Sequence, residues 1–472
     1  MGRHAALARA LVCLGFALAL SGCVAQPSAA DQQLSTAQIF EATKPAVVLV
    51  ESAEAVTWSV PEPRIDPSKQ GLLQDQLAAR VRAGTVGSSE DALKRAAVEL
   101  ITDDPGAWFS LDGSRYRRTD NVYLVGSGFF VTEDGYLLTN AHVIQDSSDD
   151  VKRQLIGGVS QGTAESGFVQ SVRDGLARGL QTDVTDEQAQ KLARWLAGVY
   201  VSDVQVESVT TTFRIALGSH SPKEVVSQGL PVKVVAQGEP VPGKDVALLK
   251  VDGGRHVALP LAAAPPGEGS PLEVVGYPCG CQAEEEVGPD KTLVPTLTQG
   301  SVRGELPMPS GWTATGTDAQ MEHGNSGGPA LDRAGQVIGL ATFRGGGSQT
   351  YNFVLPIGLA RDFTRQAKVQ PSQGPLGREY TEAVRDFGAQ HYRAALPLFE
   401  QVGRADAQNP YVASYVERSR AAIAQGRDRT PPPAPDYLQL LLSYAPYVLV
   451  GFWALGGIAA ALVLRRRRFR TA

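Results

Sequence analysis

The feature that most constrains the fold and chemistry of this chain is a serine set among glycines. It lies in the octapeptide GNSGGPAL at residues 324–331. Glycines on both sides of Ser326 suit a tight loop whose backbone N–H groups point to one place while the hydroxyl stays exposed. That place can hold the negative oxygen that develops when a serine attacks a carbonyl. Because glycine-rich turns are common, the octapeptide needs companion residues before it indicates chemistry.

Two upstream segments supply such companions. Residues 126–144 read as a strand, an Asp-Gly turn and a second strand, and His142 follows that second strand directly. Asp245 begins the apolar segment DVALLKV. A serine hydroxyl is a poor nucleophile at neutral pH unless an imidazole takes its proton and a carboxylate orients that imidazole. His142, Asp245 and Ser326 are therefore a candidate catalytic triad.

Each of these residues also has a structural interpretation when taken alone. His142 fits a core histidine beside a strand, Asp245 fits a cap or a surface carboxylate, and Ser326 fits a turn. All three structural interpretations must hold together for the triad to be an accident of sequence. The combination in this order therefore favours catalysis.

Together the segments resemble the trypsin-like serine proteases of the HtrA (Deg) branch. That branch carries Gly-Ser-Gly-Phe, Thr-Asn-x-His, Asp-Ile/Val-Ala-Leu-Leu-Lys and Gly-Asn-Ser-Gly-Gly-Pro in the order found here. The resemblance covers roughly residues 46–357 and implies an all-β fold of two six-stranded barrels, placed at residues 36–366, with the site between them. His323 departs from the proline usual in the family, and the PDZ domain that usually follows is not evident.

The resemblance also implies roles for individual residues. His142 acts as general base and then general acid, Asp245 orients it, and Ser326 forms an acyl-enzyme with a polypeptide substrate. The N–H groups of Gly324 and Ser326 bind the oxyanion. The expected substrate-binding residues are Gln320, Thr342, Phe343 and Arg344. Because Gln320 stands where proteases that cleave after Lys or Arg have an acid, we expect a neutral side chain to be preferred. No metal or organic cofactor is implied.

Two insertions interrupt this pattern, at residues 61–108 and 146–199, and both have apolar residues at helical spacing. The second includes predicted helices at 168–180 and 185–196, and strands are expected again at 201–206, 212–217 and 231–235. Large loops on a rigid β scaffold often carry function. We expect the second insertion to overhang the active-site cleft as a lid.

The N-terminus has the pattern of an export signal. Residues 1–22 combine early arginines with a short apolar run, followed by Cys23 in a lipobox-like context. Lipidation of Cys23 and ordinary cleavage after a later small residue are both open. For an exported protein, Cys279 and Cys281 fit either a tight disulfide or two loop thiols without a catalytic role.

The C-terminal part predicts a membrane anchor. Residues 377–426 have the spacing of one tetratricopeptide-like repeat and fit either a helical spacer or a docking surface for a protein partner. A proline-rich linker at 427–436 leads to the uncharged stretch 437–464, which is long enough for a transmembrane helix. The arginine-rich tail at 465–472 predicts a cytoplasmic C-terminus and an extracytoplasmic protease, anchored in the cell membrane.

Composition excludes few functions, but the net charge bears on one class of partner, nucleic acids. The chain has 472 residues and a net charge of −5, which gives no indication of nucleic-acid binding. The sequence predicts a membrane-anchored serine endopeptidase in protein quality control or regulated proteolysis. The alternative is a catalytically silent adaptor with a protease fold. The sequence leaves the oligomeric state open.

Overall fold

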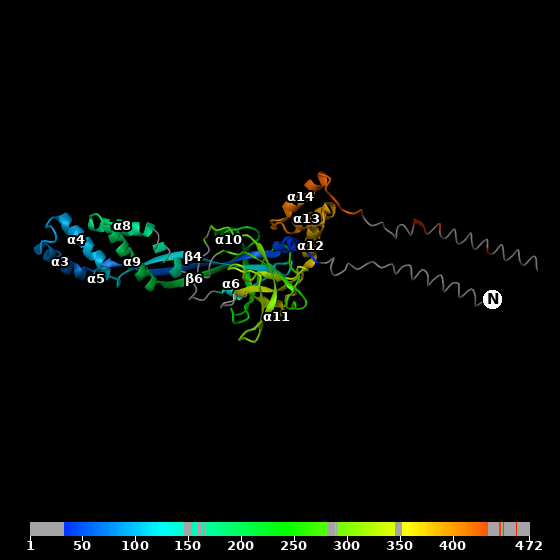
Figure 1. Cartoon of the computed structure of the whole chain (residues 1–472), viewed down its shortest axis with the longest axis horizontal. Helices are drawn as coiled ribbons and strands as arrows, with labels where there is room; N and C mark the ends of the chain where they lie inside the picture. Colours follow the sequence, from blue (N-terminus) through cyan, green and yellow to red (C-terminus); the bar gives the residue numbers. More distant parts are fainter. Residues whose placement is uncertain are drawn as a thin grey trace, which may run out of the picture.

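Two closed β-barrels form the centre of the molecule in this computed structural model (Figure 1). The structure describes residues 33–145, 153, 155–158, 160, 162–163, 166–280, 288, 290–344, 352–432, 443–444, 447 and 459. The first barrel has the strand order β1 (Val47–Pro61), β4 (Arg115–Phe130), β5 (Tyr136–Thr139), β8 (Ala247–Val251), β7 (Leu230–Gln237) and β6 (Gln205–Ala216). The second has the order β10 (Thr296–Pro307), β11 (Thr313–Thr317), β14 (Asn352–Pro356), β13 (Val337–Arg344), β12 (Pro329–Leu331) and β9 (Pro271–Gly276). The prediction of two six-stranded barrels is confirmed.

The predicted Asp-Gly hairpin is the β4–β5 turn. Gly135 has a φ of +98°, a conformation that glycine adopts without strain. The two strands pair antiparallel, with Phe129 opposite Leu138. Phe130 and Leu137 from this hairpin are fully buried in the core of the first barrel. This hairpin fixes the position of the chain that follows it, which includes His142.

Three strands of the first barrel continue far beyond it as a ribbon. β1 has 15 residues and β4 has 16, and they pair from Val47 opposite Phe129 to Pro61 opposite Arg115. β6 pairs with the other edge of β1 as far as Ser59. Figure 1 shows the ribbon running outward from the barrels to a group of helices at its far end.

Both insertions meet in that group of helices, which we call the helical head. The first contributes α3 (Gln70–Arg82), α4 (Glu90–Asp103) and α5 (Pro105–Trp108), enclosed by the short paired strands β2 (Arg64–Ile65) and β3 (Phe109–Ser110). The second contributes α8 (Ser166–Leu180) and α9 (Asp186–Ser202). The buried side chains of Val98, Val184 and Ala189 pack together between the two insertions.

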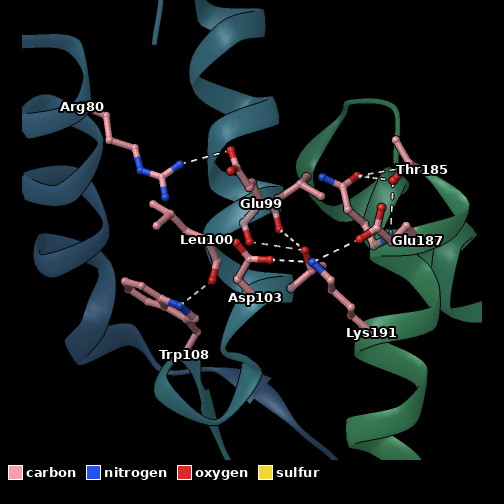
Figure 2. Close-up of polar contacts among 11 residues, drawn as sticks. Arg80, Glu99, Leu100, Asp103, Trp108, Thr185, Glu187 and Lys191 are labelled. Carbon is pink, nitrogen blue, oxygen red and sulfur yellow. Dashed lines mark hydrogen bonds and ion pairs between the residues drawn. The ribbon is translucent and has the colours of Figure 1, made fainter. Parts of the chain in front are cut away.

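Polar contacts also join the two insertions (Figure 2). Lys191 of α9 lies 2.9 Å from Asp103 of α4, and Glu187 lies 3.5 Å from the same lysine. The rings of Phe109 and Trp195 stack with centroids 5.3 Å apart. Segments far apart in the sequence therefore form one packed unit.

The prediction that the second insertion forms a lid over the cleft is wrong for its described helices. α8 and α9 lie at the far end of the ribbon, whereas α6 (Ala141–Ile144), which carries His142, lies at the barrels (Figure 1). The strand predicted at 201–206 is also wrong at its start. A capping box at Thr185 begins α9, and the helix continues to Ser202 before β6 starts at Gln205.

Helices surround the barrels (Figure 1). They are α2 (Thr36–Thr43), α10 (Pro222–Gln228), α11 (Ile357–Gln366), α12 (Gly374–Gly388), α13 (Tyr392–Ala405) and α14 (Val412–Ala424), besides the 3₁₀ turn Lys44–Ala46; a second 3₁₀ turn, Pro67–Lys69, leads into α3 of the helical head. Of these helices, α12, α13 and α14 lie at the end of the barrels away from the ribbon (Figure 1). The ring of Phe399 in α13 contacts Tyr380 of α12 at a centroid distance of 5.7 Å and Tyr415 of α14 at 4.6 Å. Residues 377–426 are thus helical, but their likeness to a tetratricopeptide repeat is not supported.

The described residues include no helix that is long and apolar enough to cross a membrane. The predicted span at 437–464 lies outside the described residues except at positions 443, 444, 447 and 459. The predicted signal at 1–22, Cys23 and the tail at 465–472 also lie outside them.

Candidate active site

His142 and Asp245 are brought together by the pairing of two strands. β5 pairs with β8, with Thr139 opposite Ala247, so the residues that flank these positions become neighbours. His142 Nδ1 lies 2.7 Å from Asp245 Oδ2, and the His142 backbone N–H donates to Asp245 Oδ1 at 2.9 Å. A carboxylate only accepts, so Nδ1 carries the proton and Nε2 is left as the basic nitrogen.

Asp245 is held as a carboxylate in a fully buried position. Burial acts to raise its pKa, but His142 and the Thr342 hydroxyl outweigh burial, and the pKa lies below its usual value. Thr342 Oγ1 donates to Asp245 Oδ2 at 2.9 Å. Asn140 Nδ2 donates to the Asp245 main-chain carbonyl at 2.7 Å and fixes the backbone there. The site therefore holds a charged acceptor behind the imidazole.

Ser326 lies on the loop between β11 and β12, with its side chain partly exposed. Its hydroxyl donates to the Thr342 carbonyl at 3.0 Å. Within the described part of the chain, which includes both residues, no hydrogen bond joins the Ser326 hydroxyl to the imidazole of His142. Catalytic hydrogen bonds are often long or misaligned without substrate, so this arrangement is compatible with a resting enzyme.

Hydrogen bonds hold the main-chain carbonyls of the loop around Ser326. Each carbonyl from 322 to 326 accepts a hydrogen bond, and the donors are Asn325 N–H, Cys279 N–H, Ser127 Oγ–H, Gly328 N–H and Ser127 N–H respectively. By contrast, the N–H groups of Gly324 and Ser326 find no acceptor among the described residues. Two unpaired amides beside a serine hydroxyl are what an oxyanion site requires.

Glycine is required at two positions of this loop. Gly324 has a φ of +93°, and a Cβ there would lie 2.1 Å from the Tyr277 carbonyl oxygen. Gly327 has a φ of +83°, and a Cβ there would lie 2.2 Å from the Ser127 carbonyl oxygen. Any other residue would displace the backbone beside the serine. Gly324 thus lets the loop pack on Tyr277 directly after β9, and Gly327 lets it pack on Ser127 of the first barrel.

The predicted substrate-binding residues lie close to one another in the fold but differ in role. Gln320 is exposed, and its carbonyl accepts from Thr298 Oγ1 at 2.7 Å. Phe343 and Arg344 end β13 and pair with β14. Thr342 differs from the expectation, because its hydroxyl is turned to Asp245 and its side chain is buried.

Cys279 is buried and forms a disulfide. Its predicted partner Cys281 lies outside the described residues, so the pairing stays a prediction. In the described part of the chain, no group of three or more His, Cys, Asp or Glu residues could hold a metal ion.

Sequence reasoning missed three contacts that build this site. They are made by the side chains of Ser127 and Asn140 and by the Thr342 hydroxyl. Ser127 and Asn140 both lie inside motifs that were used to identify the strand and the histidine. Their position in those motifs was the only signal, because nothing in the local pattern names their distant partners.

Comparisons with known proteins match the part of the chain that contains this site. Residues 126–340 match the trypsin-like peptidase domain family. The chain is 32% identical over 284 residues to a probable periplasmic serine endoprotease DegP-like from Pseudomonas fluorescens, covering 58% of this chain and 41% of that protein. A protein of the same description from Pseudomonas putida is 24% identical over 375 residues, covering 75% and 56% respectively. The chain thus spans about half the length of these relatives.

Two solved structures are also similar in part. One is the Rv3671c protease from M. tuberculosis in its active form, at 18% identity and a TM-score of 0.33, covering 71% of this chain and 86% of that one. The other is a serine endoprotease from Yersinia pestis, at 16% identity and a TM-score of 0.33, covering 71% and 66%. The match at 126–340 and the DegP-like relatives are the findings that bear on the chemistry. The match at 126–340 is thus to a trypsin-like peptidase domain, and the DegP-like relatives are described as probable serine endoproteases.

Proposed function

We propose that this protein is an HtrA-type serine endopeptidase that hydrolyses polypeptides through His142, Asp245 and Ser326. The observation that carries the proposal is the combination at one place of a histidine bonded to a buried carboxylate and two unpaired amides beside a serine. Nucleophile, base, orienting acid and oxyanion donors are the parts that acyl transfer needs.

The proposed reaction begins when Ser326 Oγ attacks the substrate carbonyl carbon. Its proton passes to His142 Nε2, and the negative oxygen is held by the N–H groups of Gly324 and Ser326. The C–N bond then breaks, and the proton passes from His142 to the leaving amine. Water repeats the sequence on the acyl-enzyme and releases the acid product. Asp245 stays ionised and stabilises the imidazolium in each half.

The edge of β13 supports binding of an extended polypeptide. Phe343 and Arg344 pair with β14 on one side, and no strand of the described chain pairs with them on the other. A substrate can add there as a further strand, so that main-chain hydrogen bonds place its scissile bond. The neutral, exposed Gln320 agrees with preference for an uncharged substrate side chain.

We further propose that the protease acts outside the cytoplasm in quality control or regulated proteolysis. The signal-like residues 1–22 and the periplasmic description of the relatives support this location. Lipidation at Cys23, a membrane span at 437–464 and a cytoplasmic tail at 465–472 rest on sequence alone. The helical segment 377–426 is retained as a candidate protein-binding surface.

One observation favours the alternative, a silent adaptor with a protease fold. The Ser326 hydroxyl bonds to the Thr342 carbonyl and not to His142. If that arrangement persisted with substrate bound, the serine would never lose its proton. The two functions therefore differ in whether the chain turns over substrate.

Cleavage of an unfolded protein by the purified full chain tests the proposal. We expect Ser326→Ala and His142→Ala to lower turnover by a factor on the order of 10⁴ to 10⁶. Ser208→Ala changes an exposed serine of β6 and should leave turnover intact. Equal turnover by wild type and Ser326→Ala would contradict the proposed function.

A further inference from the structure

Ser127 lies at the contact between the two barrels and the loop of the nucleophile. It belongs to β4 of the first barrel and is fully buried. Its hydroxyl lies 2.9 Å from the N–H of Tyr277, directly after β9, and 2.6 Å from the Gly324 carbonyl oxygen. Its backbone N–H also donates to the Ser326 carbonyl at 2.7 Å. One residue therefore contacts both sides of the oxyanion loop.

The direction of the two hydroxyl bonds is unambiguous. The Tyr277 N–H can only donate, and the Gly324 carbonyl can only accept. The single hydroxyl proton of Ser127 must therefore point at Gly324. This leaves the Ser127 hydroxyl with no freedom to rotate, and it acts as a fixed donor to the loop.

The bond to Gly324 is the only one of its kind in the loop. Of the carbonyls from 322 to 326, all except that of Gly324 accept from a backbone N–H. The His323 carbonyl is held by the Cys279 N–H at 2.7 Å, and this directs the Gly324 N–H to the opposite side of the same peptide plane. The plane after Gly324 is held at its carbonyl by the Ser127 hydroxyl and at its N–H by the bond from Asn325 to the Glu322 carbonyl at 3.1 Å. With both planes fixed, the backbone angles of Gly324 are fixed as well.

Glycine makes this anchoring necessary. A residue without Cβ can rotate its peptide planes at little cost, so Gly324 could turn its N–H away from the oxyanion if either plane were released. We propose that Ser127 is a positioning residue for acyl transfer, whose hydroxyl keeps the Gly324 N–H aimed at the oxyanion. The inference deepens the proposed function and rests on it.

A purely structural role makes a different prediction. Loss of a buried hydroxyl lowers stability wherever it occurs, because its partners are left unsatisfied. Ser221→Ala is a matched control, since Ser221 is also buried and its hydroxyl accepts the Glu224 N–H ahead of α10, outside the loop of the nucleophile. If Ser127 serves stability alone, Ser127→Ala and Ser221→Ala should have similar kinetics.

The test measures kcat, KM and inhibition by a peptide boronic acid, which forms a tetrahedral adduct whose oxygen needs the oxyanion donors. For Ser127→Ala we expect kcat to fall by about tenfold to a hundredfold, since removal of one oxyanion donor costs about 10² to 10³. KM should change by less than about twofold, because ground-state binding does not use the donor. Boronate affinity should fall by the same factor as kcat, and Ser221→Ala should match wild type in all three.

Ser127→Cys keeps a buried side chain with a weaker donor and covers the case in which Ser127→Ala does not fold. We expect it to have a kcat between those of wild type and the alanine variant. Wild-type kcat and boronate affinity in a folded Ser127 variant would overturn the inference while leaving the proposed function standing. Failure of the proposed function is separable, because wild type would then hydrolyse no faster than Ser326→Ala.

Discussion

The Thr342 carbonyl accepts the Ser326 hydroxyl at 3.0 Å, while the hydroxyl of the same threonine donates to Asp245 at 2.9 Å. Thr342 therefore contacts Ser326 and Asp245 at once. In the proposed substrate complex, its carbonyl lies on the β13 edge where an extended polypeptide would add. A substrate N–H that takes this carbonyl would release the serine hydroxyl to His142.

The Thr342 hydroxyl should contribute to turnover through Asp245. We expect Thr342→Val to lower kcat by about tenfold, since a hydrogen bond to a charged group is worth roughly 1.5–3 kcal/mol. The lost bond favoured the carboxylate, so the pKa of Asp245 should rise and the loss should grow as the pH falls. Peptide hydrolysis measured against pH checks both effects.

The matched variant is Thr342→Ser, which keeps the hydroxyl and the main-chain carbonyl. It should stay within about threefold of wild type in kcat. Equal kinetics for the valine and serine variants would show that the bond to Asp245 does not assist turnover.

A buried glutamate on the ribbon should make stability depend on pH. Burial raises the pKa of Glu51 to about 8, and Arg214, opposite it on β6, only partly opposes this. Neither carboxyl oxygen finds a hydrogen-bond partner in the described chain. The folded state therefore keeps a proton that the unfolded state loses. The stability from this group is present at pH below the unfolded value of 4.5 and is lost as the pH rises through about 8.

Glu51→Gln should remove that dependence. Between about pH 5 and about pH 9, the free energy of unfolding of the variant should rise relative to that of wild type, by an amount on the order of 1 kcal/mol or more. Chemical denaturation of the full chain at several pH values measures it. Glu268→Gln changes an exposed glutamate and should follow wild type. A constant difference between Glu51→Gln and wild type over this range would refute the assignment.

The helical head should be separable from catalysis. Leu192 of α9 is 4% exposed, so Leu192→Ala should loosen the head by about 2–5 kcal/mol. Because the ribbon separates the head from α6, kcat/KM on a short peptide should stay within about twofold (Figure 1). Hydrogen exchange in α4 and α9, measured beside peptide hydrolysis, checks this. Leu248→Ala, in the strand β8 that follows Asp245, should lower both stability and hydrolysis. An equal loss of hydrolysis in Leu192→Ala would contradict the prediction and show that the head affects the site.

The three residues of the proposed triad could be identified in the sequence because the signals around them are local. The Asp-Gly hairpin fixes the position of His142, which follows its second strand, and the apolar strand fixes the position of Asp245 at its start. The flanking glycines fix the turn at Ser326. These motifs require only neighbouring residues to be recognised. The pairing of β5 with β8 brings His142 to Asp245, and the catalytic role of all three residues stays a proposal.

The rest depends on contacts that local patterns do not encode. Helical spacing identified helices in both insertions but not the surfaces against which they pack. The lid prediction was wrong because α9 packs on α4 of the other insertion, away from the site. The bond from Ser127 to Gly324 joins residues 197 positions apart. Its motif predicted only a strand, and the role of its hydroxyl became visible in the packed barrels.

Covalent labelling with a fluorophosphonate, mapped by mass spectrometry, tests the central claim most directly. The reagent requires a serine activated by its histidine beside working oxyanion donors. We predict a label on Ser326 in the wild-type chain, a greatly slowed reaction in His142→Ala and no label in Ser326→Ala. A folded wild-type chain that stays unlabelled at Ser326, with or without an added peptide substrate, would contradict the assignment of a catalytic triad.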